Sequence, residues 1–315
     1  MKISQALHGF RIARLADGYS ESTLVVYEWA LNELKSYLGD PDVEDVTLDK
    51  LRSYMYHLRH NYRTRTGTQL SGSSLDNHWK AIRSFFRWCS EGLDIGRPDL
   101  NLPRPKFTSK EIRPFSQEEI RDILEACTHT KRYDTQDRKA FRRMRPTAHR
   151  DTSIIMVLLD TGIRVSELCR LEVKDVNLET GEVIVRPHGT GQKTKPRSSF
   201  VGRRTKKTLW RYLQETDLRS NDLLFYSIYD RPMNRRSVHN LLQNIGNNAG
   251  VDNVHPHRFR HTFATEFLRN GGTIEVLQRI LGHSTLSMVL RYAQITSDDI
   301  MDVQRRASPG DNWRL

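Results

Sequence analysis

The sequence lacks three features that would direct its interpretation elsewhere. It contains no run of 18 or more apolar residues, so no membrane-spanning helix is expected. The first twenty residues have no apolar core of the kind found in secretory signals, so a cytoplasmic protein is expected. The three cysteines, Cys89, Cys127 and Cys169, are far apart and odd in number. They are predicted to be free thiols in a reducing compartment, not a disulfide framework or a CxxC metal site.

Acidic residues are scarce in part of the chain, and the imbalance is local. The formal net charge is +12 over 315 residues. Up to Phe107 there are 15 basic and 13 acidic residues, and beyond it there are 35 and 25. Thr128–Arg150 has eight Lys or Arg against two Asp, and Arg186–Lys207 has eight and no acid. Charge concentrated in this way favours contact with a nucleic-acid backbone over general solubility.

The length fits about two domains. Residues 1–107 show amphipathic helical stripes, for example the one that includes Leu24 and Leu31, and Ser74 is predicted to cap a third helix. Asn101–Pro114 contains three prolines and few apolar residues, so it is predicted to be an extended linker. We therefore expect a helical domain over 1–107 and a second domain, with a C-terminal tail, over 108–315. The predicted fold class is mainly α with a small β-sheet or hairpin (α+β).

The second domain shows several local structural patterns. Ser116 and Glu119 have the spacing of a capping box, which predicts a helix start. Val183 and Val185 share one face of a predicted strand, which is followed by a basic loop and a returning strand. The basic segment 128–150 has no clean hydrophobic period. We expect it to be a surface excursion, either one that contacts phosphates or a disordered insertion.

The most informative stretch runs from His257 to Tyr292. His257, Arg260 and His261 fall at positions i, i+3 and i+4, which lie on one face of a helix. Pro256 is predicted to be the first residue of this helix, Thr273 can cap the next one, and Gly282 is predicted to end it. His283 follows that end, and Tyr292 comes nine residues later. A guanidinium can hold a phosphate through two hydrogen bonds, and a phenol can attack it. The combination therefore suits chemistry on a phosphate.

This ordered set of residues resembles a known family. The pattern His257-x-x-Arg260, the string LGH and Tyr292 resemble the second motif block of the tyrosine recombinases, the phage integrase family. The string TGIRVSELCRL resembles the first block. A helix is predicted to end at Gly162 within this string, and the next helix is predicted to begin with Arg164 in its first turn. The resemblance covers roughly residues 114–300, and the N-terminal half resembles the family more loosely. It implies an N-terminal helical core-binding domain that clasps DNA and a C-terminal catalytic domain.

The resemblance implies a site-specific recombinase or integrase that cuts and rejoins DNA through a covalent 3′-phosphotyrosyl intermediate. Tyr292 is the implied nucleophile, and it needs assistance because a phenol has a pKa of about 10. Arg164 and Arg260 would hold the non-bridging oxygens of one phosphate and stabilise the transition state. His257 would assist proton transfer, and His283 would hydrogen-bond the phosphate. No metal and no cofactor are expected.

The loop of the predicted hairpin supplies the remaining catalytic residue. Lys193 is the implied general acid, with Lys195 as the alternative, because the loop is longer than the family pattern. Thr190 stands where a Gly-Lys-Gly turn would place the lysine. By the same resemblance, Glu167 is implied to support Arg164 without itself contacting the phosphate. Contacts to DNA are expected from one helix of the N-terminal domain and from the hairpin, through Lys80, Arg83, Arg87, Lys195 and Arg197.

The implied partner is double-stranded DNA with short inverted-repeat core sites. Exchange between two duplexes needs four active sites, so a homotetramer is expected to assemble on the DNA. The extra basic segment 128–150 favours the integrase of a mobile element over a Xer-type resolvase of chromosome dimers. A type IB topoisomerase and a catalytically inactive DNA-binding protein are further alternatives. A zinc site formed by His255, His257, His261 and His283 is disfavoured, because no glutamate base lies between His257 and His261 and Arg260 would repel a cation.

Overall fold

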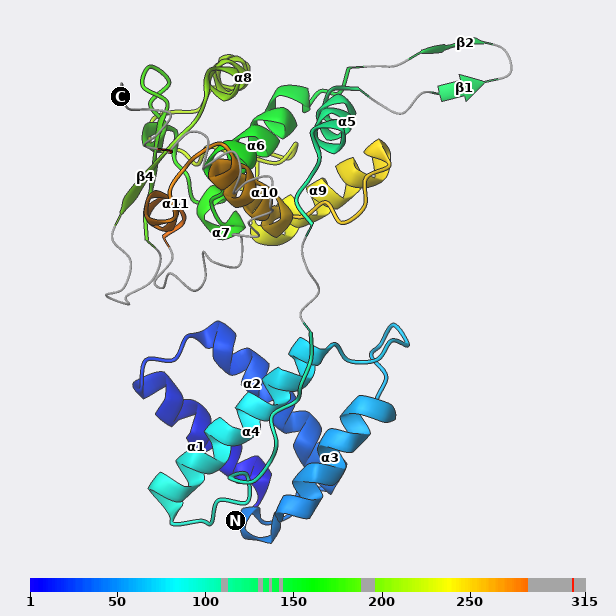
Figure 1. Ribbon diagram of the computed structural model, residues 1–315, viewed down its shortest axis with the longest axis vertical. Coiled ribbons are helices and arrows are strands. Elements are labelled where there is room, and N and C mark those ends of the chain that lie inside the picture. The colour runs from blue at the N-terminus through cyan, green and yellow to red at the C-terminus, as the bar shows by residue number, and fades with distance from the viewer. Residues whose placement is uncertain are drawn as a thin grey trace. The chain divides into compact units, whose positions relative to one another are not determined.

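The computed structural model describes residues 1–108, 113–129, 144–187, 196–282 and 308, together with the backbone of 133–135 and 138–141. The chain divides into two compact units, Met1–Glu111 and Ile112–Leu315 (Figure 1). The sequence places its predicted boundary a few residues earlier, after residue 107. Within the described ranges, no helix combines the length and the apolar character needed to cross a membrane.

The N-terminal unit is helical, as the sequence predicts. Leu24 and Leu31 of the predicted stripe are fully buried in its core. The chain enters α2 and α3 through Ser20 and Thr47, whose hydroxyls each accept a hydrogen bond from the backbone N–H three residues on. The elements are α1 (Ile3–Ala16), α2 (Glu21–Leu38), the 3-10 turn η1 (Val43–Asp45), α3 (Leu48–His60) and α4 (Gly72–Leu93).

The start of α4 differs from its prediction. The sequence favours Ser74 as the cap, but the hydroxyl of Ser71 accepts a hydrogen bond from the Ser74 N–H at 3.1 Å. Several neighbouring serines offer equivalent caps, so the local pattern does not choose between them. Phe107 packs directly on Gly72, where an added Cβ would lie 2.3 Å from the Phe107 Cβ. This long-range contact requires glycine at position 72 and cannot be recognised from a local pattern.

The C-terminal unit combines helices with two short antiparallel strand pairs, so the predicted mainly α class with a small β component is confirmed (Figure 1). Its helices are α5 (Gln117–Thr128), α6 (Ala148–Thr161), α7 (Val165–Leu168), α8 (Arg203–Gln214), α9 (Arg235–Ala249), α10 (Pro256–Arg269) and α11 (Ile274–Leu281), with the 3-10 turn η2 (Val173–Asp175). The strand pairs are β1 (Tyr133–Thr135) with β2 (Arg138–Phe141), and β3 (Glu182–Val185) with β4 (Arg197–Phe200).

The pair formed by β1 and β2 lies in the basic segment 128–150 and is absent from the sequence prediction. Its strands have three and four residues, which is too short for an alternating pattern to be recognised. The pairing also shifts register between Tyr133 and Thr135. The β3–β4 pair, by contrast, follows its prediction, because Val183 and Val185 are buried on one face.

The scaffold of the predicted site forms where α6, α10 and α11 meet. Gly162 ends α6 in the left-handed region with φ of +57°, as predicted for this stop. An added Cβ there would lie 2.4 Å from Cδ1 of Phe263 and 3.0 Å from Cδ2 of Leu281. Glycine therefore meets two requirements, since it allows the turn and lets α10 and α11 pack against the end of α6.

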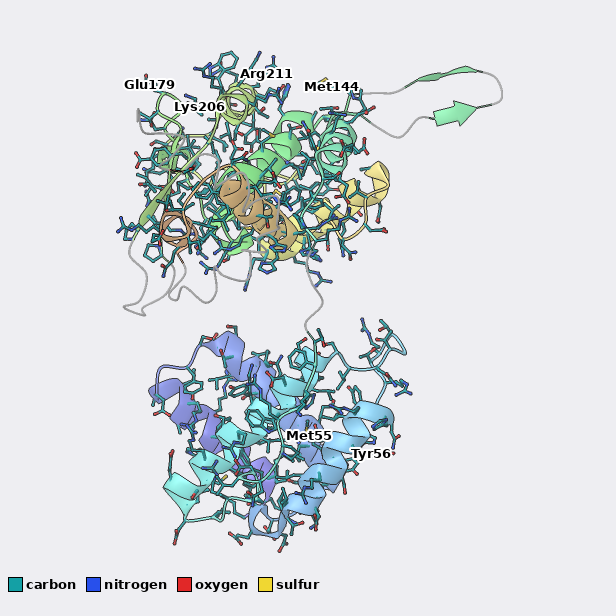
Figure 2. The ribbon with its side chains drawn as sticks, viewed as in Figure 1. Met55, Tyr56, Met144, Glu179, Lys206 and Arg211 are labelled. Carbon is teal, nitrogen blue, oxygen red and sulfur yellow. The ribbon has the colours of Figure 1, made fainter. Side chains whose placement is uncertain are left out.

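Helix α8 is tied to the segment before β3 and to the end of α6. Lys206 donates from Nζ to the carbonyl oxygen of Glu179 at 2.8 Å, and both side chains are labelled in Figure 2. Thr205 donates from its hydroxyl to the Asp160 carboxylate at 2.6 Å. Arg211, also labelled in Figure 2, lies on the exposed face of the same helix.

Candidate active site

Arg164 lies immediately before α7, as the residue that caps it. The sequence predicts it inside the first turn, but its backbone is extended, with φ of −71° and ψ of 148°. Its N–H donates to Oε2 of Glu167 at 2.7 Å, and its Nη1 donates to Oε1 at 3.2 Å. The carboxylate offsets a positive charge at a helix start, which the helix dipole disfavours. The side chain of Arg164 remains 43% exposed.

Glu167 is the buried hub of the site, with 9% of its side chain exposed. It accepts the two bonds from Arg164 and two more from Arg197, whose Nη1 and Nη2 lie 3.0 and 2.7 Å from the carboxylate oxygens. Burial by itself would raise the pKa of Glu167, but the hydrogen bonds from Arg197 and Arg164 outweigh burial, so this pKa lies below its ordinary value. The group is therefore an ionised carboxylate at neutral pH.

Arg260 joins the ends of two other helices. It rises from α10, and it is buried, with only 3% of the residue exposed. Nη1 donates to the carbonyl oxygen of Gly162 at 2.7 Å, and Nη2 donates to that of Leu281 at 2.8 Å. A guanidinium carries five N–H donors, so these two bonds fix its plane without defining its full set of partners. Arg260 and Arg164 are thus brought to the same corner, since Gly162 is two residues before Arg164.

His257 lies in the first turn of α10, where Pro256 is the first helical residue as predicted. Partial desolvation, and then the positive charges of Arg260 and Arg164, lower the pKa of His257. The His257 side chain is nevertheless exposed to solvent, so a phosphate can reach it. His257 lies one turn before Arg260 on α10, and Arg260 binds the carbonyl oxygen of Gly162, two residues before Arg164, so the three residues gather at one corner. The imidazole is neutral at physiological pH and can accept a proton.

The remaining predicted catalytic residues, Lys193, His283 and Tyr292, lie outside the described residues, as does the alternative Lys195. Their roles stay predictions. The described chain nevertheless leads up to two of them. Helix α11 ends at Gly282, the residue before His283, with φ of +62° as the sequence predicts. Strand β4 begins a few residues after the lysines.

The predicted DNA contacts of the N-terminal unit divide into two groups. Arg83 donates from Nη1 to the carbonyl oxygen of Asp99 at 2.9 Å and pairs with its carboxylate at 3.3 Å. Lys80 pairs with Asp76 at 2.9 Å, although its side chain is exposed. Arg87 is exposed on the same helix. Arg83 therefore serves its own unit, while Lys80 and Arg87 are accessible to a partner.

Arg197 departs furthest from its prediction as a DNA contact. It is only 12% exposed, and besides its two bonds to Glu167 it donates from Nε to the carbonyl oxygen of Ile280 at 2.7 Å. The pairing of β3 with β4 sets Arg197 opposite Val185, and residues directly opposite share a face of the sheet. The sequence predicts that Val185 faces the core, but only the register of the returning strand shows that Arg197 lies opposite it.

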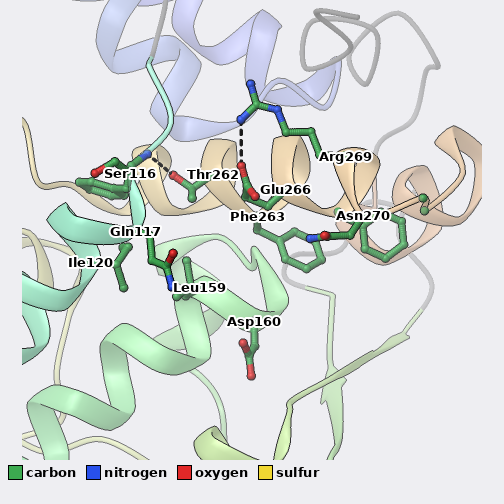
Figure 3. Close-up of a pocket in the computed structure, with 14 residues that line it drawn as sticks. Ser116, Gln117, Ile120, Leu159, Asp160, Thr262, Phe263, Glu266, Arg269 and Asn270 are labelled. Atoms are coloured by element: carbon green, nitrogen blue, oxygen red, sulfur yellow. Dashed lines mark hydrogen bonds and ion pairs between the residues drawn. The ribbon is translucent and has the colours of Figure 1, made fainter. Parts of the chain in front are cut away.

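A separate open pocket of about 850 Å³ lies in the same unit, between the start of α5, the end of α6 and the second half of α10 (Figure 3). Glu266 and Arg269, which pair at 3.0 Å, lie at its rim. None of the four clustered side chains described above lines this pocket. Apolar side chains, including Phe115, Phe263 and Phe267, line much of this pocket, whereas a DNA duplex requires a basic surface. In the described part of the chain, no group of three or more His, Cys, Asp or Glu could hold a metal ion.

The C-terminal unit thus gathers two arginines, a histidine and a buried glutamate, a set of side chains that suits the binding of a phosphate. Residues 113–298 match the phage integrase family, and residues 11–92 match the phage integrase N-terminal SAM-like domain. The chain belongs to the phage integrase family and is a tyrosine recombinase.

Relatives and solved structures extend over nearly the whole chain. The tyrosine recombinase XerC of Staphylococcus epidermidis is 28% identical over 298 residues, which cover 92% of each chain. The tyrosine recombinase XerA of Thermococcus onnurineus is 31% identical over 297 residues, covering 88% of this chain and 94% of that one. A Tn1549 transposon integrase in complex with a circular intermediate DNA aligns with a TM-score of 0.74 at 20% identity, covering 97% of this chain and 99% of that one, which shows the shared fold.

Proposed function

We propose that the chain recombines DNA at a specific site through a covalent 3′-phosphotyrosyl intermediate on Tyr292, as the enzyme of a mobile element. The observation that carries this proposal is the cluster of Arg164, His257 and Arg260 in one corner of the C-terminal unit. Two positive charges and a neutral imidazole suit a single phosphate on which negative charge increases during the reaction. The family membership supplies the reaction class.

The proposed reaction is a phosphoryl transfer in two reversible steps. The Tyr292 oxygen bonds to the scissile phosphorus while the bond from phosphorus to the 5′ oxygen breaks. His257 assists removal of the phenol proton, and Lys193 gives a proton to the leaving 5′ oxygen. Arg164 and Arg260 hold the non-bridging oxygens throughout. The new ester keeps the energy of the phosphodiester, so a 5′-hydroxyl from another strand can reverse the step without ATP.

DNA binding is proposed to use both units. In the N-terminal unit, Lys80 and Arg87 lie exposed on α4 and are suited to phosphate contacts. In the C-terminal unit, Lys195 belongs to the basic loop between β3 and β4. The substrate is double-stranded DNA with short inverted repeats, on which four copies assemble in association with the nucleoid. Solved complexes of integrase and recombinase with DNA that share this fold support the proposal.

A Xer-type resolvase of chromosome dimers is the second candidate, and a specific observation favours it. The chain is 28% identical to XerC and 31% identical to XerA, and these similarities extend along nearly the full length of each relative. The basic segment 128–150 favours the mobile-element role instead. The two roles differ in their substrate, since a resolvase acts on one chromosomal site and an integrase acts on the ends of its own element.

The direct test is covalent capture of DNA by the full-length protein. Purified protein is mixed with sheared DNA from its source cell, and fragments that remain attached in detergent are sequenced. The wild type is expected to retain fragments that share inverted repeats around a short spacer, while Tyr292→Phe binds DNA but retains none. Recovery of element ends favours the integrase, and recovery of one chromosomal locus favours the resolvase.

The controls for this capture are Tyr226→Phe and Tyr229→Phe, because both tyrosines lie outside the motif. Either variant should retain fragments at the wild-type yield. An adduct of full yield with Tyr292→Phe would contradict the proposed nucleophile. Relaxation of supercoiled DNA without any shared site among the captured fragments would favour a type IB topoisomerase.

A further inference from the structure

One guanidinium group, that of Arg197, joins three segments of the C-terminal unit. Nη1 and Nη2 donate to the two oxygens of Glu167 at 3.0 and 2.7 Å, and Nε donates to the carbonyl oxygen of Ile280 at 2.7 Å. Arg197 starts from β4, Glu167 belongs to α7, and Ile280 lies in the last turn of α11. Bonds within the protein therefore use three of the five guanidinium donors.

The end of α11 is held by two arginines on consecutive carbonyl groups. Arg197 binds the carbonyl oxygen of Ile280, and Arg260 binds that of Leu281 at 2.8 Å. The last carbonyls of a helix have no partner within it and carry partial negative charge, so guanidinium groups suit this end. An added Cβ at Gly282 would lie 3.2 Å from Cδ, Nε and Cζ of Arg197. Arg197 thus packs against the residue that precedes His283 in the chain.

Arg197 reaches Arg164 through the shared carboxylate of Glu167. Each oxygen accepts one bond from each arginine, and the bonds from Arg164 measure 3.2 Å to Oε1 and 2.7 Å to Oε2. The two parallel bonds from Arg197 fix the plane of the carboxylate. The orientation of the carboxylate in turn sets where its oxygens accept the hydrogen bonds from the N–H and Nη1 of Arg164. Loss of Arg197 would let Glu167 rotate and would shift Arg164.

We infer that Arg197 is a positioning residue for recombination and not a contact to the DNA backbone. It sets Glu167, which sets Arg164, and it fixes the end of α11, from which the chain continues to His283 and Tyr292. The inference rests on the proposed function, because the position of Arg164 matters only if Arg164 binds the scissile phosphate. A phosphate at Arg197 would have to displace the Glu167 carboxylate from a site where Arg197 is 12% and Glu167 is 9% exposed.

The first test measures cleavage separately from binding. The probe is a duplex that carries the captured site and a nick that traps the covalent complex, at saturating concentration. Arg197→Gln is expected to form the complex about 100-fold more slowly, because small misplacements of a catalytic group have effects of this size. Arg211→Gln, which removes an exposed arginine from α8, is the matched control and should form it at the wild-type rate.

The salt dependence of DNA binding separates positioning from phosphate contact. Each lost phosphate contact lowers the slope of log K against log salt concentration by about 0.9. A positioning role predicts an unchanged slope for Arg197→Gln, measured by fluorescence anisotropy on the same duplex. A lower slope, with cleavage of the bound complex at the wild-type rate, would overturn the inference and restore the DNA contact.

A second substrate tests whether Arg197 acts through Arg164. In this duplex a methyl group replaces one non-bridging oxygen of the scissile phosphate, so the charge that Arg164 would stabilise is absent. The defects of Arg164→Ala and Arg197→Gln should both shrink on this substrate. A defect of Arg197→Gln that is equally large on both substrates would indicate general damage to the fold and would overturn the inference.

Further variants keep the test decisive if Arg197→Gln folds poorly. Arg197→Lys retains the charge but not the two parallel bonds, and Glu167→Gln retains the shape but not the charge. Both should show the same substrate-dependent defect, and Glu167→Gln combined with Arg197→Gln should be no slower than the slower single variant. If the wild type forms no adduct, or if Arg164→Ala is fully active, the proposed function itself fails. If only the Arg197 and Glu167 variants behave like wild type, this inference fails alone.

Discussion

Each unit contains a buried carboxylate shared by two arginines, and the two arrangements differ in what they leave accessible. In the N-terminal unit, Asp99 is fully buried and pairs with Arg83 and Arg97, whose side chains are 28% and 19% exposed. In the C-terminal unit, Glu167 pairs with Arg197, which is 12% exposed, and with Arg164, which is 43% exposed. The first arrangement turns both arginines inward and fastens the chain after α4. The second keeps one arginine inside and presents the other, which is what a phosphate-binding site requires.

The largest effect on DNA cleavage is expected from Arg260→Lys, in the C-terminal unit. Lysine keeps the charge but cannot span the carbonyl groups of Gly162 and Leu281, which Arg260 holds at 2.7 and 2.8 Å. Cleavage of bound DNA should fall by at least about 1,000-fold, as for other arginines that stabilise a phosphoryl transition state. The rate of covalent-complex formation at saturating DNA is the measurement. A variant that cleaves within tenfold of wild type would exclude Arg260 from the reaction.

A smaller effect, and one of a different kind, is expected from Asp99→Asn in the N-terminal unit. The change leaves Arg83 and Arg97 without their carboxylate, which should lower the free energy of unfolding by roughly 1–3 kcal/mol. Urea denaturation measures this loss. Because neither arginine is assigned to the reaction, the cleavage rate of the bound complex should stay at the wild-type value. A cleavage defect as large as that of Glu167→Gln would remove the distinction between the two carboxylates.

The smallest expected effect is a change in the pKa of His257, which tests whether Arg164 lies beside it. Desolvation and the charges of Arg260 and Arg164 lower its pKa, so the folded protein takes up this proton only at a lower pH than the unfolded chain does. Protonation therefore opposes folding as the pH falls through this range. Arg164→Gln removes one positive charge and should raise the pKa of His257, and the rise should be small because solvent screens the interaction. NMR titration of labelled histidine measures it.

The control for this titration is Arg211→Gln, which should leave the pKa of His257 unchanged. If Arg164→Gln has no more effect than this control, Arg164 and His257 do not share a site. Cleavage by the wild-type protein should also decline on acidification through the lowered pKa of His257, since the protonated imidazole can no longer accept a proton.

Local signals in the sequence were sufficient for much of the scaffold. The capping box of Ser116 and Glu119, the cap at Thr273, the proline at the start of α10 and the glycine stop at Gly282 all appear as predicted. Each depends on backbone groups within a few residues, so a short pattern contains the necessary information. The buried face of β3 was equally accessible, because alternation needs only the strand itself.

The contacts of Arg197 have a different origin. They depend on the strand opposite it and on α11, which no local pattern includes. A positive charge after a basic loop predicts a DNA contact when only its neighbours in sequence are considered. The carboxylate that neutralises Arg197 is thirty residues away. Composition and local pattern therefore cannot predict which charged side chains pair with each other in the folded protein.

The central claim is that Arg164 and Arg260 converge on one phosphate with Tyr292 beside it. A structure of the Tyr292→Phe protein bound to an uncleaved duplex tests it most directly. Guanidinium nitrogens of both arginines are predicted to lie about 2.7–3.2 Å from non-bridging oxygens of the same phosphate, with the ring of residue 292 facing its phosphorus. Arginines that contact different phosphates, or a ring at 292 that lies away from both, would contradict the account.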